Sequence, residues 1–188
     1  MIVNKTKYLE FKCAKSPTDN DWHYVRRTND SKSHDSAVCI TTIVKKDNKF
    51  NFLLLKTRRP PIYSESKAEF CIESPAGLIG DEINDESLSD CVKKELSEEA
   101  GIKADKIFIE LYNSSTSSGL SSETLTYVTS ITDDYSIINQ PVSDGGIIVD
   151  RFLVPVDEIY SYLQNIDYKK YSVASATVCG IFFALKRL

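Results

Sequence analysis

The segment KELSEEAGI, residues 94–102, carries three acidic side chains at helical spacing. Glu95, Glu98 and Glu99 stand at i, i+3 and i+4, so an α-helix would place their carboxylates on one face. Like charges at this spacing repel, at a cost of roughly a few tenths of a kcal/mol for each pair. A solvated acidic face would explain an isolated cluster. A hard divalent cation would instead use all three carboxylates, because Mg²⁺ and Ca²⁺ prefer oxygen ligands.

Apolar side chains predict a helix around this segment. Leu88, Val92 and Leu96 recur at every fourth position within residues 85–100, and Gly101 follows where a helix ends. Pro60-Pro61 and the turn Pro75-Ala76-Gly77 are expected to end two strands, because proline cannot donate to a β-ladder. Helices are expected again at 156–165 and 172–187. The predicted strands cover residues 7–14, 21–28, 37–45, 50–57, 70–72, 106–112, 123–131 and 147–154. This order of elements predicts the α/β class with a mixed sheet.

The bulk composition is that of an ordinary globular protein. The 188 residues, 41% hydrophobic and 27% charged, fit one domain with room for a small subdomain. A net charge of −4 without a basic run argues against nucleic-acid binding, and no apolar run is long enough to predict a membrane span. Five widely spaced cysteines without a Cys-x-x-Cys pair predict neither a zinc site nor a disulfide framework, and indicate a reducing compartment. Because there are only two histidines, acid–base chemistry is expected to rest on carboxylates.

The acidic segment and the residues before it resemble the signature of the Nudix hydrolase family. That pattern is Gly, five residues, Glu, seven residues, then Arg-Glu-apolar-x-Glu-Glu-x-Gly-apolar. Gly80, Glu86 and residues 95–102 fit it, and Lys94 stands in place of the arginine. The resemblance implies a Nudix-type α/β/α sandwich with a mixed sheet.

Other segments resemble one branch of this family, the eukaryotic ADP-sugar pyrophosphatases that act on ADP-ribose. These segments are Trp22 followed by Arg27, Arg59-Pro60-Pro61, residues 73–79 and Gly119-Leu120-Ser121. The resemblance implies Mg²⁺-dependent cleavage of ADP-ribose and related nucleotide sugars to AMP and a sugar phosphate, with Mn²⁺ as a substitute metal. It also implies a domain-swapped homodimer, in which residues 1–35 form an N-terminal β subdomain and residues 36–188 form the hydrolase domain. The expected location is the cytoplasm or the nucleus.

The same resemblance assigns the site residues one by one. Glu95, Glu98, Glu99 and the backbone carbonyl of Ala76 would hold the metal, and Glu98 and Glu99 would also serve catalysis. Trp22 and Tyr8 would enclose the adenine from different subunits, although a tryptophan is by default more often a core residue. Arg27 and Arg59 would bind phosphates or the terminal ribose, since guanidinium groups match phosphate oxygens. The remaining substrate contacts would be Glu73, Gly119 and Leu120.

The sequence departs from the family pattern in several places. Lys94 keeps the charge of the usual arginine but loses its bidentate geometry, and Ser118 stands where this branch has proline. The Ala76-Gly77 turn is expected to take the role of the first glycine of the signature. Glu86 is expected to face away from the metal and to act as a first-turn helix charge, with an ion pair as its second role.

The family's catalytic loop glutamate has no clear counterpart in this chain. The candidates for the general base are Asp144, Glu123 and one of the glutamates in residues 94–102. Two alternatives to the leading function stay open. One is a Nudix hydrolase of another nucleoside diphosphate derivative, and the other is an ADP-ribose-binding Nudix domain without turnover.

Overall fold

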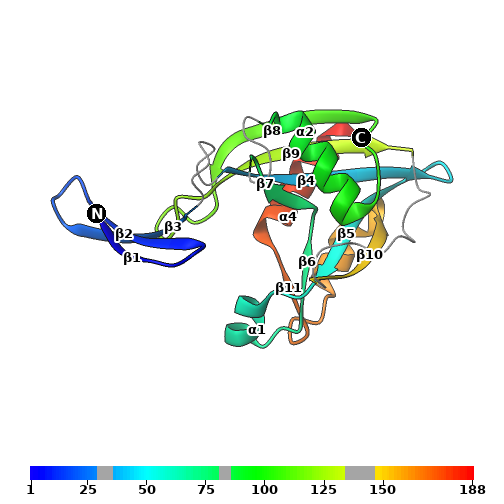
Figure 1. Ribbon diagram of the computed structural model, residues 1–188. Helices are drawn as coiled ribbons and strands as arrows, with labels where there is room; N and C mark the ends of the chain where they lie inside the picture. The colour runs from blue at the N-terminus through cyan, green and yellow to red at the C-terminus, as the bar shows by residue number, and fades with distance from the viewer. Residues whose placement is uncertain (29–35, 81–85, 134–146) are drawn as a thin grey trace.

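Two β-sheets organise the chain (Figure 1). The computed structural model describes residues 1–28, 36–80, 86–133 and 147–188. A three-stranded antiparallel sheet is formed by β1 (Ile2–Lys5), β2 (Leu9–Lys15) and β3 (Asp21–Arg27). This N-terminal sheet extends away from the main body of the molecule, which is built on an eight-stranded sheet.

The eight-stranded sheet is mixed, as the sequence predicts. Its main path runs β11-β6-β5-β4-β9-β8, with β10 paired to β5 and β7 paired to β4. The β4–β9 and β11–β6 pairs are parallel, and the other pairs are antiparallel. The strands are β4 (Ser36–Lys46), β5 (Lys49–Thr57), β6 (Phe70–Glu73), β7 (Ala76–Leu78), β8 (Lys106–Ser115), β9 (Thr124–Thr132), β10 (Ile148–Pro155) and β11 (Tyr171–Val173).

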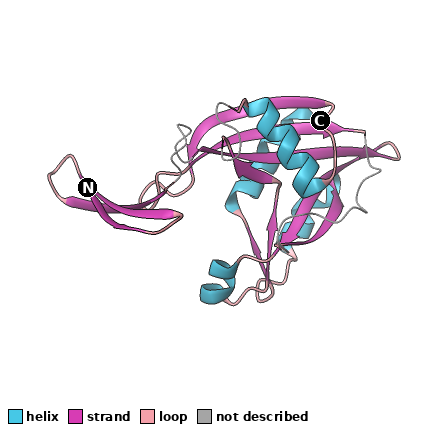
Figure 2. Ribbon diagram, in the orientation of Figure 1, coloured by secondary structure: helices cyan, strands magenta, loops and turns pink. Residues whose placement is uncertain are grey.

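Helices cover both faces of this sheet, which gives the predicted α/β/α sandwich (Figure 2). Helix α2 (Leu88–Glu95) continues into a π-helical turn, η1 (Leu96–Ala100), on one face. On the other face lie η2 (Val156–Glu158), α3 (Ile159–Gln164), α4 (Ser175–Ala184) and η3 (Leu185–Arg187).

Adjacent residues of β5 enter different cores. Leu53 belongs to the cluster formed with Val92 and Leu96 of the α2 segment, whereas Phe52 and Leu54 belong to the cluster beneath α3 and α4. Successive side chains of a strand point to opposite faces, so a continuous apolar run is what a strand covered on both sides requires.

Helix α4 lies close to the sheet at Gly180. A Cβ atom at this glycine would lie 2.1 Å from Oγ1 of Thr41 on β4, so only glycine allows this approach. The missing side chain therefore sets the spacing between α4 and the sheet.

The structure corrects four expectations about the elements. Pro60-Pro61 ends β5 but also begins helix α1 (Pro60–Ser66), since proline is tolerated in the first turn of a helix. The expected turn at Ala76-Gly77 is the short strand β7, which pairs with β4. Residues 171–173 form β11 beside β6, so the last helix begins only at Ser175. Strand β1 was not expected, because its four residues, IVNK, show no alternation of apolar and polar side chains.

The N-terminal sheet has almost no core of its own. Its exposed apolar side chains are Ile2, Val3, Leu9, Phe11 and Trp22. Backbone contacts attach it to the segment before β9: Val25 N donates to Leu120 O at 2.8 Å, and Ser122 N donates to Val25 O at 3.2 Å. Within the described ranges, no helix combines the length and apolar character needed to cross a bilayer.

Candidate active site

Two of the three predicted carboxylates pack against strand β7. Oε2 of Glu99 accepts a hydrogen bond from the backbone N–H of Ala76 at 2.8 Å. Glu95 is buried against Gly77, where a Cβ atom would lie 1.9 Å from Glu95 Oε1 and 2.0 Å from its Cδ. The structure therefore brings Ala76, Gly77, Glu95 and Glu99 together, and Gly77 leaves the space that the Glu95 carboxylate fills.

The π-helical turn explains why Glu98, the remaining carboxylate, does not pack against β7. Residues 96–100 follow the i→i+5 pattern, so the fourth residue after Glu95, rather than the third, comes back toward its face. Glu99 accordingly reaches β7, while Glu98 is exposed to solvent. The sequence expectation of one shared face, which assumed α-helical spacing, is therefore correct for Glu95 and Glu99 only.

Lys94 links two carboxylates on the inner side of this helix. Its Nζ lies 3.5 Å from Glu86 Oε1 and 3.6 Å from Glu95 Oε1. The other oxygen of Glu86 accepts a hydrogen bond from the backbone N–H of Gly80, which has a left-handed φ of 76°. The prediction for Glu86 as a first-turn helix charge is wrong, since the helix begins after the N-cap Ser87. Glu86 instead closes the Gly80 turn, and its contact with Lys94 confirms the ion pair that was expected as its second role.

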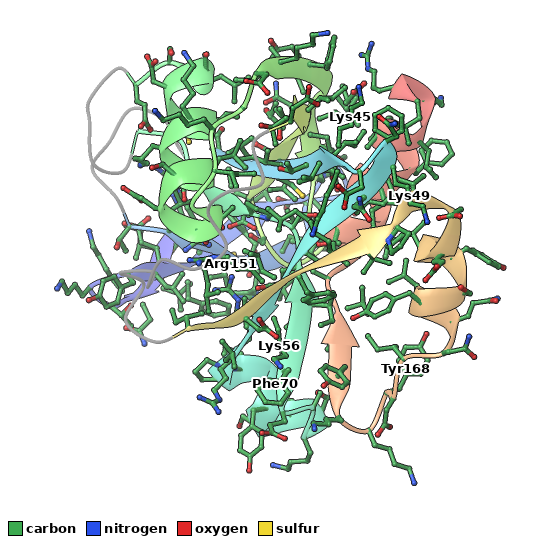
Figure 3. All side chains as sticks on the ribbon, turned by 90° about the vertical axis from the view of Figure 1, so that its right-hand side faces the viewer. Lys45, Lys49, Lys56, Phe70, Arg151 and Tyr168 are labelled. Carbon is green, nitrogen blue, oxygen red and sulfur yellow. The ribbon has the colours of Figure 1, made fainter. Side chains whose placement is uncertain are left out.

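Arg151 is a site residue that sequence reasoning missed. It lies on β10, is buried, and donates a hydrogen bond from Nε to the backbone carbonyl of Glu99 (Figure 3). The pKa of Arg151 is lowered mainly by burial, and the charge of Glu99 opposes this change. The sequence could have indicated this residue, because it is the one arginine in the largely apolar strand predicted at 147–154. An arginine that is buried in such a strand needs a polar partner. Arg151 thus fixes the end of the helix that carries the carboxylates.

The thiols near the site are not suited to nucleophilic chemistry. Burial raises the pKa of Cys39 to about 12, and burial followed by the charge of Glu73 raises the pKa of Cys71 to about 12. Both therefore stay protonated at neutral pH, whereas a nucleophilic cysteine needs its thiolate. That acid–base chemistry here rests on carboxylates stays a prediction.

Arg59 and Glu73 form a second polar group beyond β7. Nε of Arg59 donates to Glu73 Oε2 at 2.8 Å, and the hydroxyl of Thr57 donates to the same oxygen at 2.7 Å. The Glu73 side chain is mostly buried, while that of Arg59 is more than one-third exposed. Glu73 thus holds the guanidinium of Arg59 through Nε, and the Arg59 side chain stays accessible to solvent.

The predicted substrate residues near the N-terminal sheet contact one another. Trp22 donates from Nε1 to Gly119 O at 3.0 Å, and Leu120 O accepts from Val25 N. Arg27 donates to Glu123 Oε2 from Nε at 3.1 Å and from Nη2 at 2.8 Å. Glu123 therefore helps to attach the sheet, and its role as a general base stays a prediction.

Tyr8 and Trp22 lie at opposite ends of the β2–β3 ladder. Trp22 pairs with Ala14, and Tyr8 O accepts from Thr28 N just beyond the Leu9–Arg27 pair. Trp22 and Thr28 are six steps apart along this extended segment, which corresponds to roughly 20 Å. The two rings of one chain therefore cannot enclose one base. Both are strongly exposed, at 68% for Tyr8 and 52% for Trp22.

The site residues predicted from sequence thus fall into three groups: the carboxylates at β7, the Arg59–Glu73 pair, and the contacts of the N-terminal sheet. In the described part of the chain, no three His, Cys, Asp or Glu side chains are gathered as a complete metal cage. The donor chemistry nevertheless fits Mg²⁺, which commonly takes one or two carboxylates together with water and substrate phosphates. Asp144 lies outside the described residues.

Comparisons with known proteins agree with this geometry. A family model described as NUDIX domain matches residues 33–174. Among solved structures, the chain is similar to an ADP compounds hydrolase, with a TM-score of 0.68, 17% identity, and coverage of 100% of this chain and 90% of that one. It is also similar to the NUDIX domain of Shewanella oneidensis NrtR complexed with ADP ribose, with a TM-score of 0.58, 20% identity, and coverage of 81% and 86%. At these identities the two structures support the fold. No curated protein is significantly similar in sequence.

Proposed function

The chain belongs to the NUDIX domain family, and on this premise we propose that it hydrolyses the pyrophosphate bond of ADP-ribose and related ADP-sugars to AMP and a sugar phosphate. The observation that carries this proposal is the packing of Glu95 and Glu99 against Gly77 and Ala76. Two carboxylates packed against one strand, with Arg59 bound to Glu73 three residues earlier in the chain, are suited to a diphosphate with bound cations.

Glu95, Glu99 and the carbonyl of Ala76 would hold Mg²⁺, or Mn²⁺ in its place, while Glu98, which does not share their face, would keep its carboxylate for catalysis. The bound metal would neutralise charge on the phosphoryl oxygens and lower the pKa of a water molecule. The chain's own residues orient these ligands. The N–H of Ala76 fixes one oxygen of Glu99, and Arg151 holds the backbone of Glu99.

The protein must also accept a proton and bind the substrate. Glu98 precedes Glu99 in the chain and is exposed to solvent, so among the described residues it is our choice for the general base. Arg59, held by Glu73 and accessible to solvent, would bind a phosphate oxygen through its guanidinium. Trp22 would stack on adenine, a contact worth about 1–3 kcal/mol.

A homodimer is part of this proposal, because each adenine would need the Trp22 of one subunit and the Tyr8 of the other. The exposed apolar side chains of the N-terminal sheet support it, since an isolated small sheet is marginal without packing. We expect Trp22→Ala and Tyr8→Ala each to raise KM by about tenfold or more.

Mixing the two variants tests the shared site directly. After subunit exchange, each heterodimer contains one site with both rings, so we expect about a quarter of the sites to regain the wild-type KM. No recovery on mixing, or a chain that sediments as a monomer, would refute the exchange of the N-terminal sheet. Mixing each variant with itself is the control.

A second candidate function is ADP-ribose binding without turnover. The contact of Lys94 with Glu95 favours it, because the ammonium group competes with a cation for the same carboxylate. In this case the protein would be a ligand-dependent module rather than an enzyme.

A substrate panel with Mg²⁺ separates these functions. We expect AMP release from ADP-ribose and other ADP-sugars, and little release from oxidised nucleoside triphosphates or from other nucleoside diphosphate derivatives. Failure on every ADP-sugar would eliminate the proposed reaction. Calorimetry on the same samples shows whether ADP-ribose then binds without turnover, which would establish the second candidate.

A further inference from the structure

A basic pocket lies beyond the Arg59–Glu73 pair. Its volume is about 700 Å³, within the range of small-molecule sites. The side chains that line it come from the end of β5, helix α1 and the loop before β11, and include Arg58, Arg59, Tyr63, Lys67, Lys169 and Lys170. Five of these six are cationic, in a chain whose net charge is −4.

The positive charge of this basic pocket is weakly compensated. Among the described residues, Arg58, Lys67, Lys169 and Lys170 have no carboxylate within ion-pair distance, and the pocket contains one acidic side chain, Glu69. Three of these cations lie over an aromatic ring instead: the guanidinium of Arg58 is 5.6 Å and Nζ of Lys170 is 5.8 Å from the ring centre of Phe70, and Nζ of Lys67 is 6.0 Å from that of Tyr63. Such contacts hold the side chains without neutralising them.

The basic pocket lies one short chain segment from the candidate active site. Arg59 lines the pocket and binds Glu73, and the chain then runs three residues, roughly 10 Å, to Ala76 beside Glu99. A substrate whose diphosphate lies at the carboxylates can therefore extend past Arg59 into the pocket. Guanidinium and ammonium groups without carboxylate partners bind phosphate oxygens well.

We propose that this basic pocket is a second phosphate subsite, which binds a phosphate group carried by the sugar half of the substrate. The preferred substrate class is then a nucleoside diphosphate sugar with a further phosphate on its terminal ribose. The apolar ring of Tyr63 and the volume of the pocket leave room for that ribose. The hydrolysis of this substrate class rests on the proposed function. The binding of phosphate in the pocket is independent of it.

The kinetic test compares ADP-ribose with ADP-ribose phosphorylated on its terminal ribose. In the wild-type protein we expect kcat/KM for the phosphorylated compound to be about tenfold higher, because charged hydrogen bonds to phosphate are added. The double variant Lys169→Gln/Lys170→Gln should raise KM about tenfold for the phosphorylated compound, and less than about twofold for ADP-ribose.

The matched control is Lys45→Gln/Lys49→Gln, which removes the same charge at the β4–β5 hairpin, away from Phe70 (Figure 3). It should leave both substrates unchanged. Equal effects of the two double variants, or equal effects on the two substrates, would overturn the subsite.

A binding experiment keeps this result separate from the proposed function. Calorimetry with inorganic tripolyphosphate, without divalent cations and at physiological salt, should show binding to the wild-type and control proteins and about tenfold weaker binding to Lys169→Gln/Lys170→Gln. This loss would support the pocket even if no ADP-sugar is hydrolysed. Unchanged binding in that variant, or no binding to the wild type, would reject the subsite whatever the outcome of the substrate panel.

Discussion

Replacing Glu99 by glutamine is expected to lower kcat for ADP-ribose on the order of a thousandfold, because stabilising phosphoryl charge through a bound cation is worth several kcal/mol. The fold should survive. The amide oxygen of glutamine can still accept the hydrogen bond of Ala76 N–H, and the side-chain volume is nearly unchanged. Steady-state kinetics with Mg²⁺ and a thermal unfolding curve measure the two effects.

The control for this variant is Glu158→Gln, the same substitution at an exposed position of η2 on the opposite face of the sheet. It should keep full activity. If Glu99→Gln kept wild-type kcat as well, Glu99 would be excluded as a metal ligand or catalytic group. If Glu99→Gln lowered the unfolding temperature as well, and kcat fell only as far as the folded fraction did, Glu99 would have only a structural role.

The elements with a regular pattern of apolar side chains were predicted correctly from the sequence. The α2 segment shows this best, since Leu88, Val92 and Leu96 mark its inner face and Gly101 ends it. The apolar run of β5 likewise predicted a strand, and the structure shows that this strand is buried on both sides. Such patterns depend on local periodicity, which a single chain displays directly.

Elements that depend on tertiary contacts were not predictable. Strand β7 exists because residues 37–39 offer it a ladder, and the π-helical turn gives no distinct periodicity over five residues. The consequence for the site is large, because the turn decides that Glu99 faces β7 while Glu98 is exposed. A sequence motif therefore cannot distinguish an α-helical turn from a π-helical turn, although the two turns orient Glu98 and Glu99 differently.

The partners of the site residues were also beyond the sequence. The motif named Glu95 and Glu99, but not Lys94 between two carboxylates or Arg151 at the backbone of Glu99. Residues 99 and 151 are far apart in the chain, and nothing in their local patterns links them. Only the pairing of β10 with β5 brings Arg151 to the helix end.

A methyl group at Gly77 is expected to cost about a hundredfold in kcat/KM. The added Cβ would lie 1.9 Å from Oε1, 2.0 Å from Cδ and 2.7 Å from Cγ of Glu95, so the whole carboxylate must leave its place. Displacing a reacting or ligand group by about 1 Å can reduce rates a hundredfold. Because Glu95 would hold the cation, the Mg²⁺ concentration that gives half-maximal activity should also rise in Gly77→Ala.

Gly180→Ala is the matched control, because it makes a comparable collision at a distance from the carboxylates. Its Cβ would lie 2.1 Å from Oγ1 of the buried Thr41, between α4 and the sheet. Overpacking of this kind typically costs about 1–3 kcal/mol of stability, so Gly180→Ala should unfold at a lower temperature while kcat/KM and the Mg²⁺ requirement stay near wild type. If the Mg²⁺ concentration for half-maximal activity rises in Gly77→Ala but not in Gly180→Ala, the Mg²⁺ requirement depends on the position of Glu95. Should Gly77→Ala instead keep the wild-type Mg²⁺ dependence, the carboxylate that fills the space over β7 would not be a metal ligand, and the proposed hydrolysis would lose its central support.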